Sequence, residues 1–194
     1  MRNRCKALAS ILATTCVVAL GAAGSASATQ WNPQGGPTGP FSSTITYSDT
    51  GGGTFVCVLS GYMNTSGAVA TTADASGAAA GPVWSSCSNN ISPMLTACIT
   101  SSSAWTLTAI NTSSVIESGI NFVLKLGTGS TCASPICTET VTGGGVDGTY
   151  NNTTHELAED PSSAFAVTGS GFCPGSFFGS FNGTIRMPTT VTIT

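Results

Sequence analysis

Basic side chains are scarce in this sequence, and most of them lie at its beginning. Of five Lys and Arg residues in 194, three fall among the first six positions, which leaves Lys125 and Arg186 against eight Asp and Glu. A protein that follows a nucleic-acid backbone needs several basic contacts to phosphate groups. We therefore expect neither a nucleic-acid partner nor attraction to an anionic membrane surface.

Long apolar runs are also missing. The longest, from about Ala7 to Ala23, is shorter than the roughly 20 apolar residues of a membrane span and is interrupted by threonines. It follows a positively charged start and precedes the small-residue site Ala26-Ser27-Ala28, which completes the pattern of a secretory signal. The sequence predicts that residues 1–28 are a cleaved signal peptide. The mature protein is then secreted or held in the cell envelope, without stable membrane insertion.

Only one histidine is present, His155, and this restricts the catalytic sites that the chain could form. No G-x-S-x-G motif is present to place a nucleophilic serine, and no H-E-x-x-H motif to bind zinc. Because His155 lies in a polar, acidic segment, we expect a solvated loop residue rather than a general base. Helix signals are nearly absent, and the best of them is a single turn over 155–160 before Pro161.

The cysteines predict disulfide bonds. Two of the eight belong to the predicted signal peptide, and an even number remains for an exported domain. A zinc site is the alternative, but the sequence has no C-x-x-C motif and a single histidine to support one. We expect three disulfides, and the spacing leaves their pairing open. The six cysteines are Cys57, Cys87, Cys98, Cys132, Cys137 and Cys173.

Alternation of apolar and polar residues recurs along the chain. Segments 41–47, 105–109 and 120–126 alternate with period two and are rich in Thr, Ile and aromatic residues, which is typical of half-buried strands. Glycine-containing segments between such runs predict turns. They include 49–53, 127–134, 143–145, Asp147-Gly148 and Asn182-Gly183. The pattern predicts an all-β fold, an antiparallel β-sandwich or barrel of roughly ten short strands stapled by disulfides.

The predicted organisation is simple. Residues 29–40, which include the run WNPQGGPTGP, form an extended Pro/Gly-rich arm, and residues 41–194 form a single all-β domain. Within that domain, segment 66–82 consists largely of small residues and is expected to be a weak strand followed by a surface loop.

The carboxylates offer two hypotheses. A pair of them could serve glycoside hydrolysis. Alternatively, Glu156, Glu159 and Asp160, together with Asp147 and Asn151, could bind Ca²⁺, because oxygen atoms are the ligands of that ion. The spacing matches no EF-hand loop, and an acidic turn in solvent explains the cluster equally simply. We expect no cofactor.

Aromatic residues divide into core and surface candidates. Trp105, which alternates with Thr, is expected in the core, and Trp84, between Pro82 and Cys87, is expected to pack on a disulfide. Trp31, Phe177 and Phe178, beside Gly and Pro, are candidates for an exposed platform that stacks on sugars or peptides. The alternative is an edge strand covered by the N-terminal arm.

The order of several short motifs resembles a group of exported all-β proteins of actinobacteria. The motifs run Gly39-Pro40-Phe41, Cys57, Cys87, Trp105-Thr106-Leu107, Cys137-x-x-x-Val141, Gly148-x-Tyr150-x-Asn152, Cys173 and Thr190-Val191-Thr192. The resemblance implies the bridges Cys57–Cys87 and Cys137–Cys173. Cys98 and Cys132 then look like an added pair. The group supplies no active site to carry over.

Three functions remain open at this point. The first is a non-enzymatic module, extracellular or attached to the envelope, that acts structurally or by binding an extracellular ligand or protein. The second is a secreted hydrolase of polysaccharide or peptide. The third is a secreted inhibitor that presents a disulfide-anchored loop such as 127–137.

Overall fold

The computed structural model describes residues 29–35, 37–73 and 81–194. The predicted signal peptide and most of the loop expected after residue 73 lie outside these ranges. The described chain has thirteen strands and no helix, so the all-β prediction is confirmed, although the strands are more numerous and longer than expected. In these ranges no helix long and apolar enough to cross a membrane is present. In chain order the strands are β1 (Trp31–Asn32), β2 (Pro37–Asp49), β3 (Thr54–Ser66), β4 (Val69–Ala73), β5 (Val83–Asn89), β6 (Thr96–Ser101), β7 (Thr106–Ala109), β8 (Ser114–Gly127), β9 (Pro135–Asn151), β10 (Glu156–Glu159), β11 (Phe165–Gly171), β12 (Ser176–Arg186) and β13 (Thr192–Ile193).

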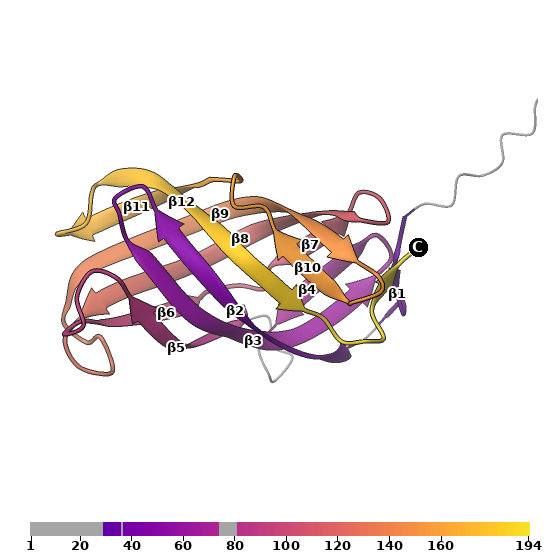
Figure 1. Ribbon diagram of the computed structural model, residues 1–194, viewed down its shortest axis with the longest axis horizontal. Helices are drawn as coiled ribbons and strands as arrows, with labels where there is room; N and C mark the ends of the chain where they lie inside the picture. Colours follow the sequence, from indigo (N-terminus) through magenta and orange to yellow (C-terminus); the bar gives the residue numbers. More distant parts are fainter. Residues whose placement is uncertain (1–28, 36, 74–80) are drawn as a thin grey trace, which may run out of the picture.

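The main sheet closes on itself. Antiparallel pairing runs through β2, β3, β4, β7, β8, β9, β11 and β12 and returns to β2. Further along β9 and β12, the short strand β10 takes the place of β11 between them and pairs with both. On the other side of the molecule β5 pairs with β3, and β6 with β8. The result is an elongated body of two facing layers joined at their edges (Figure 1).

Long strands can close in this way because they bend at irregular points. The β8–β9 pairing shifts register between Glu117 and Ile120 and again before Phe122. Gly119 and Gly143, on either side of this irregularity, have φ values of 68° and 66°, a conformation that glycine adopts without steric cost. Such bulges increase the local twist and let a long ladder curve.

Aromatic rings fill the interior. The Tyr47 ring lies between those of Phe55, Phe122, Phe165 and Phe181, with centroids 5.3 to 6.2 Å away, and all five side chains are buried. Trp105, as expected, is also buried, and so is Trp84. The two pack on each other and on Phe181. Burial of these large rings contributes strongly to the stability of the fold.

The predicted N-terminal arm is part of the fold and plugs one end of it. β1 pairs with β13, and the Trp31 indole, 0% exposed, donates a hydrogen bond to the Leu107 carbonyl at 3.2 Å. It also contacts Tyr150 edge-on, and the Tyr150 hydroxyl donates to the Val191 carbonyl at 2.6 Å. The prediction that Trp31 is exposed is therefore wrong, because the C-terminal strand holds the arm over the sheet opening. We call this the plugged end; it lies at the right of Figure 1.

The helical turn predicted over 155–160 is also wrong. Residues 156–159 form β10, in which Leu157 and Glu159 point inward and Ala158 outward. Pairing on both sides of so short a segment overrides its weak helix propensity. His155, just before it, is half-buried, with Nδ1 2.8 Å from the Val191 carbonyl oxygen, rather than solvated.

Three disulfides are present, as the sequence predicts. Cys57–Cys87 joins β3 to β5, Cys98–Cys132 joins β6 to the β8–β9 loop, and Cys137–Cys173 joins β9 to the β11–β12 turn. These are the pairs that the resemblance implied. Each disulfide adds roughly 2–4 kcal/mol of stability by restricting the unfolded chain.

Candidate functional site

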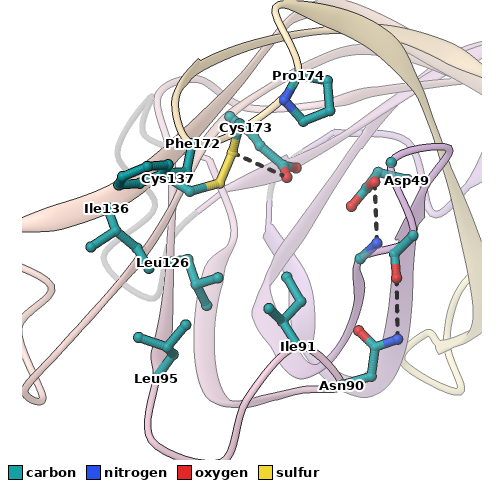
Figure 2. A pocket seen from close by; sticks show the side chains of 14 residues that line it. Asp49, Asn90, Ile91, Leu95, Leu126, Ile136, Cys137, Phe172, Cys173 and Pro174 are labelled. Carbon is teal, nitrogen blue, oxygen red and sulfur yellow. Dashed lines mark hydrogen bonds between the residues drawn. A yellow bond between two sulfur atoms is a disulfide. The ribbon is translucent and has the colours of Figure 1, made fainter.

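A pocket of about 400 Å³ opens at the end of the sheet opposite the plug (Figure 2). We call this the pocket end. Its walls come from the β2–β3 turn, the β5–β6 loop, the adjoining ends of β8 and β9, and the β11–β12 turn. The lining residues are Asp49, Gly51, Gly52, Gly53, Asn90, Ile91, Leu95, Leu126, Ile136, Cys137, Glu139, Phe172, Cys173 and Pro174.

The β2–β3 turn fixes Asp49 at one wall. The sequence Asp-Thr-Gly-Gly-Gly folds back so that the Gly53 amide donates to Asp49 Oδ1 at 3.2 Å. A Cβ on Gly53 would collide with Asp49 Oδ2, so this close approach requires glycine. Asn90 ties the neighbouring loop to the turn, because its Nδ2 donates to the Gly52 carbonyl at 3.2 Å and its Oδ1 accepts from the Thr54 amide at 2.8 Å.

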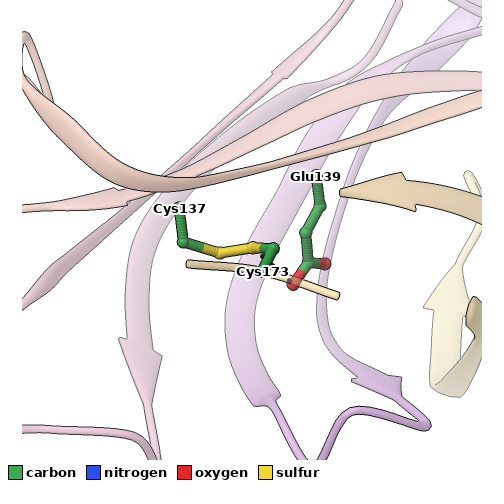
Figure 3. Close-up of side chains that lie close together, drawn as sticks. All are labelled: Cys137, Glu139 and Cys173. Carbon is green, nitrogen blue, oxygen red and sulfur yellow. Dashed lines mark hydrogen bonds between the residues drawn. A yellow bond between two sulfur atoms is a disulfide. The ribbon is translucent and has the colours of Figure 1, made fainter. Parts of the chain in front are cut away.

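Glu139 lies on the inward face of β9 and is only 3% exposed. The Tyr47 hydroxyl donates a hydrogen bond to Oε2 at 2.8 Å. Oε1 lies 3.8 Å from Cys173 Sγ (Figure 3), and a disulfide sulfur has no hydrogen to donate. Within the described chain, Oε1 therefore lacks a hydrogen-bond donor.

The environment of Glu139 changes its acidity. Burial raises the pKa to about 7, the Tyr47 hydrogen bond opposes that rise, and the charge of Asp49 adds to it. Burial and the adjacent Glu139 in turn raise the pKa of Tyr47, which stays a neutral donor. The carboxyl of Glu139 can therefore gain or lose a proton near neutral pH.

Exposed apolar side chains surround the pocket. Ile91 is 49% exposed, Ile136 39% and Phe172 89%. Phe172 stands at the tip of the β11–β12 turn, and sequence reasoning missed it. The available signal was an aromatic residue inside the turn-forming run Ser-Gly-Phe-Cys-Pro-Gly, where it has no strand to pack on.

The predicted aromatic platform is only partly present. Of its three members, Trp31 is buried at the plugged end and Phe177 is buried at 7% exposure, because β12 directs alternate side chains inward. Phe178, the next residue, faces outward at 57% exposure. It lines a second, smaller pocket that also includes Asp49. Asp49 therefore belongs to two pockets, one lined by Phe172 and the other by Phe178.

The proposed calcium ligands do not converge on one site. Glu156 forms an ion pair with Arg186 at 3.2 Å, and Glu159 points into the interior at 6% exposure. Asp147 and Asp160 lie outside and make hydrogen bonds with serines. Asn151 Oδ1 accepts from the backbone of the following turn. Alternation within β10 separates Glu159 from its neighbours.

One trio of potential metal ligands does converge in the described ranges. Cys137, Glu139 and Cys173 have ligand atoms within 4.8 Å of one another (Figure 3). The two sulfurs are bonded to each other, however, and a metal requires thiolates. The oxidised protein therefore offers one carboxylate at this point.

A pair of buried acids lies inside the closed sheet. Glu117 is 1% exposed and Glu159 6%, and within the described chain the donor for Glu117 is the carboxyl of Glu159 when that group is protonated. Burial raises the pKa of Glu117 to about 7. Burial and the charge of Glu117 raise that of Glu159 further, so Glu159 keeps its proton and can donate it to Glu117. This pair is enclosed in the interior and lines none of the pockets described here.

The pocket, rather than His155, brings acids together where a substrate could reach them. The His155 ring contacts the Val191 carbonyl instead of a serine or an acid. Asp49 and Glu139, by contrast, line one cavity. The protein-family models, the curated proteins and the solved structures searched contain no match to this chain.

Proposed function

We propose that the mature protein is a secreted or envelope-associated binding module, without catalytic activity, that takes a small and largely apolar ligand into the pocket. The observation that carries this proposal is the asymmetry of the two ends. Trp31 plugs one end, aromatic rings fill the interior, and the other end keeps a cavity of about 400 Å³. That volume lies within the range of small-molecule sites, roughly 300–1,000 Å³.

The rim of the pocket supports binding rather than a purely structural role. Ile91, Ile136 and Phe172 expose apolar surface around a single opening, where a ligand would remove it from water. The walls are also held in place before binding, by Cys137–Cys173 and by the Asn90 hydrogen bonds. A preformed site loses little conformational entropy when it is occupied.

The disulfides and the N-terminal sequence support the proposed location. Disulfides form and persist in oxidising compartments, and the first 28 residues have the pattern of an export signal. Detection of the mature protein in culture medium or envelope fractions, beginning at Thr29, tests this part of the proposal.

A fluorescence titration with a neutral apolar probe such as N-phenylnaphthylamine tests the binding role. We expect saturable enhancement that weakens at least about fivefold in Ile91→Ser. Val83→Ser, which removes a side chain of similar exposure (45%) outside the pocket, should leave it unchanged. Equal weakening in both variants, or no saturable binding, would overturn the proposal.

A hydrolase is the second candidate, because one observation favours it. Asp49 and Glu139 line one cavity, and a carboxyl with a pKa of about 7 suits a general acid. The test is product release from soluble oligosaccharides and peptides. Activity that Glu139→Gln and Asp49→Asn both abolish would establish the enzyme and refute the non-catalytic role.

A further inference from the structure

The charge of the pocket narrows the class of ligand, provided that the proposed binding role holds. Asp49 and Glu139 are the ionisable side chains of its lining, apart from the bonded cysteines. The mature sequence has two basic residues to balance them. Lys125 faces solvent on β8, and Arg186 is paired with Glu156. The pocket is therefore negative as well as apolar.

Glu139 supplies the second observation. A buried carboxylate is unfavourable unless hydrogen bonds or an opposite charge compensate it. Tyr47 satisfies Oε2, whereas no donor from the described residues reaches Oε1, and the side chain borders the cavity. A donor that enters through the pocket would complete this site, and a positively charged donor would stabilise the ionised form most strongly.

We propose that the pocket binds an organic ammonium ion: a primary amine attached to a compact apolar body. The ammonium group has three donors, and Glu139 and Asp49 are the two carboxylates of the lining that can accept from them. Asp49 Oδ1 already accepts from the Gly53 amide, which leaves Oδ2 for the ligand. The apolar body then packs on Leu95, Leu126 and Phe172 near the opening.

Ionisation of Glu139 links this binding to pH. Tyr47 and Asp49 are the ionisable neighbours that act on Glu139, and its pKa of about 7 leaves roughly one molecule in a hundred charged at pH 5. An ammonium ligand favours the charged form and competes with the proton. Its affinity should therefore rise between pH 5 and pH 8, by up to about 100-fold.

Three probes of matched length separate the classes: hexylammonium chloride, hexanol and sodium hexanoate. Each is titrated into the isotopically labelled mature protein at pH 8 and pH 5, and amide shifts are followed by NMR. We expect hexylammonium to bind at least about tenfold more tightly than hexanol at pH 8, with shifts around Leu126, Ile136 and Phe172. Hexanoate should bind most weakly, because its charge repels that of Glu139.

Variants assign the preference to Glu139. Glu139→Gln keeps an acceptor for Tyr47. It should weaken the preference for hexylammonium over hexanol, because Asp49 is left as the one carboxylate of the lining, and it should remove the rise in affinity between pH 5 and pH 8. Asp147→Asn removes a charge outside the pocket and should preserve both. Phe172→Ser alters a side chain that is 89% exposed, so the variant should fold, and it should weaken both ligands alike.

The outcomes are distinct. Preferential binding of hexylammonium that is weakened in Glu139→Gln and loses its pH dependence there supports the inference. Equal binding of hexanol and hexylammonium overturns the ammonium assignment and leaves the apolar binding role intact. No shift at the pocket with any of the three probes overturns both.

Discussion

Replacing Glu139 by glutamine should change the pH dependence of stability in a defined direction. The folded-state pKa of this carboxyl is about 7, against an ordinary value of 4.5. The folded protein therefore binds the proton more tightly than the unfolded chain. The resulting stability is fully present below pH 4.5 and is lost as the pH rises towards 7. Glutamine cannot ionise and carries no such dependence.

The magnitude follows from the difference in pKa. A little over two units, at about 1.4 kcal/mol per unit, gives a loss of about 3 kcal/mol between pH 4.5 and pH 8. Because Glu139 borders the open pocket, solvent screening lowers this figure, and about 3 kcal/mol is its upper limit. The stability of Glu139→Gln relative to the original protein should therefore rise by up to about 3 kcal/mol over that interval.

Denaturant unfolding at several pH values, with the disulfides intact, measures this difference. Glu117 and Glu159 make both proteins less stable with rising pH, so the informative quantity is the gap between the two curves. Asp147→Asn controls for a change of net charge at an exposed site. Parallel curves for Glu139→Gln and the original protein would refute the reasoning, since they would mean that the buried carboxyl does not titrate as described.

Three further predictions concern the stability of the fold. Glu159→Gln should raise the melting temperature at pH 8, because it removes one of two enclosed acids and its amide can still donate to Glu117. Trp31→Ala should lower the free energy of unfolding by about 3–5 kcal/mol and speed hydrogen exchange of the terminal amides. Faster exchange without a loss of stability would contradict the role of Trp31 as a plug. Phe177→Ala should cost a similar amount and Phe178→Ala less than about 1 kcal/mol, and the reverse order would place β12 in the wrong register.

The strand prediction succeeded where alternation was uninterrupted and failed at glycines. Segment 143–145, Asp147-Gly148 and Asn182-Gly183 are typical turn sequences, yet they lie within β9 and β12. This is why short strands were expected where β9 and β12 are long.

Packing explains those glycines. A Cβ on Gly148 would lie 2.7 Å from Leu157 Cδ1, and one on Gly183 would lie 2.7 Å from Ile45 Cδ1. The glycines make room for large inward side chains on neighbouring strands. A sequence cannot distinguish a glycine that bends the chain from one that accommodates a partner far away in the chain.

The buried acids show a signal that was present but not used. In Cys137-Thr-Glu-Thr-Val141, alternation places Glu139 on the same face as two buried residues. Likewise, Leu157 and Glu159 share a face, although the acidic composition of that segment indicated solvent. The charge of Glu139 and Glu159 favoured a surface position, whereas their place in the alternating pattern favoured a buried one. Both side chains are buried, so the alternation was the correct guide. The neighbours that make burial tolerable come from distant strands, which the sequence does not reveal.

The buried pair Glu117 and Glu159 and the single buried Glu139 are stabilised in different ways, and the difference bears on function. Glu117 and Glu159 face each other inside the closed sheet, where a proton on one satisfies the other. Glu139 has no such partner, because Tyr47 reaches one oxygen and the other lies beside a disulfide sulfur. If Glu139 served packing alone, glutamine would meet the needs of Tyr47 without the cost of a buried charge. An ionisable group with one oxygen unsatisfied, at the border of a cavity open to solvent, is better explained by a ligand that brings the missing positive charge.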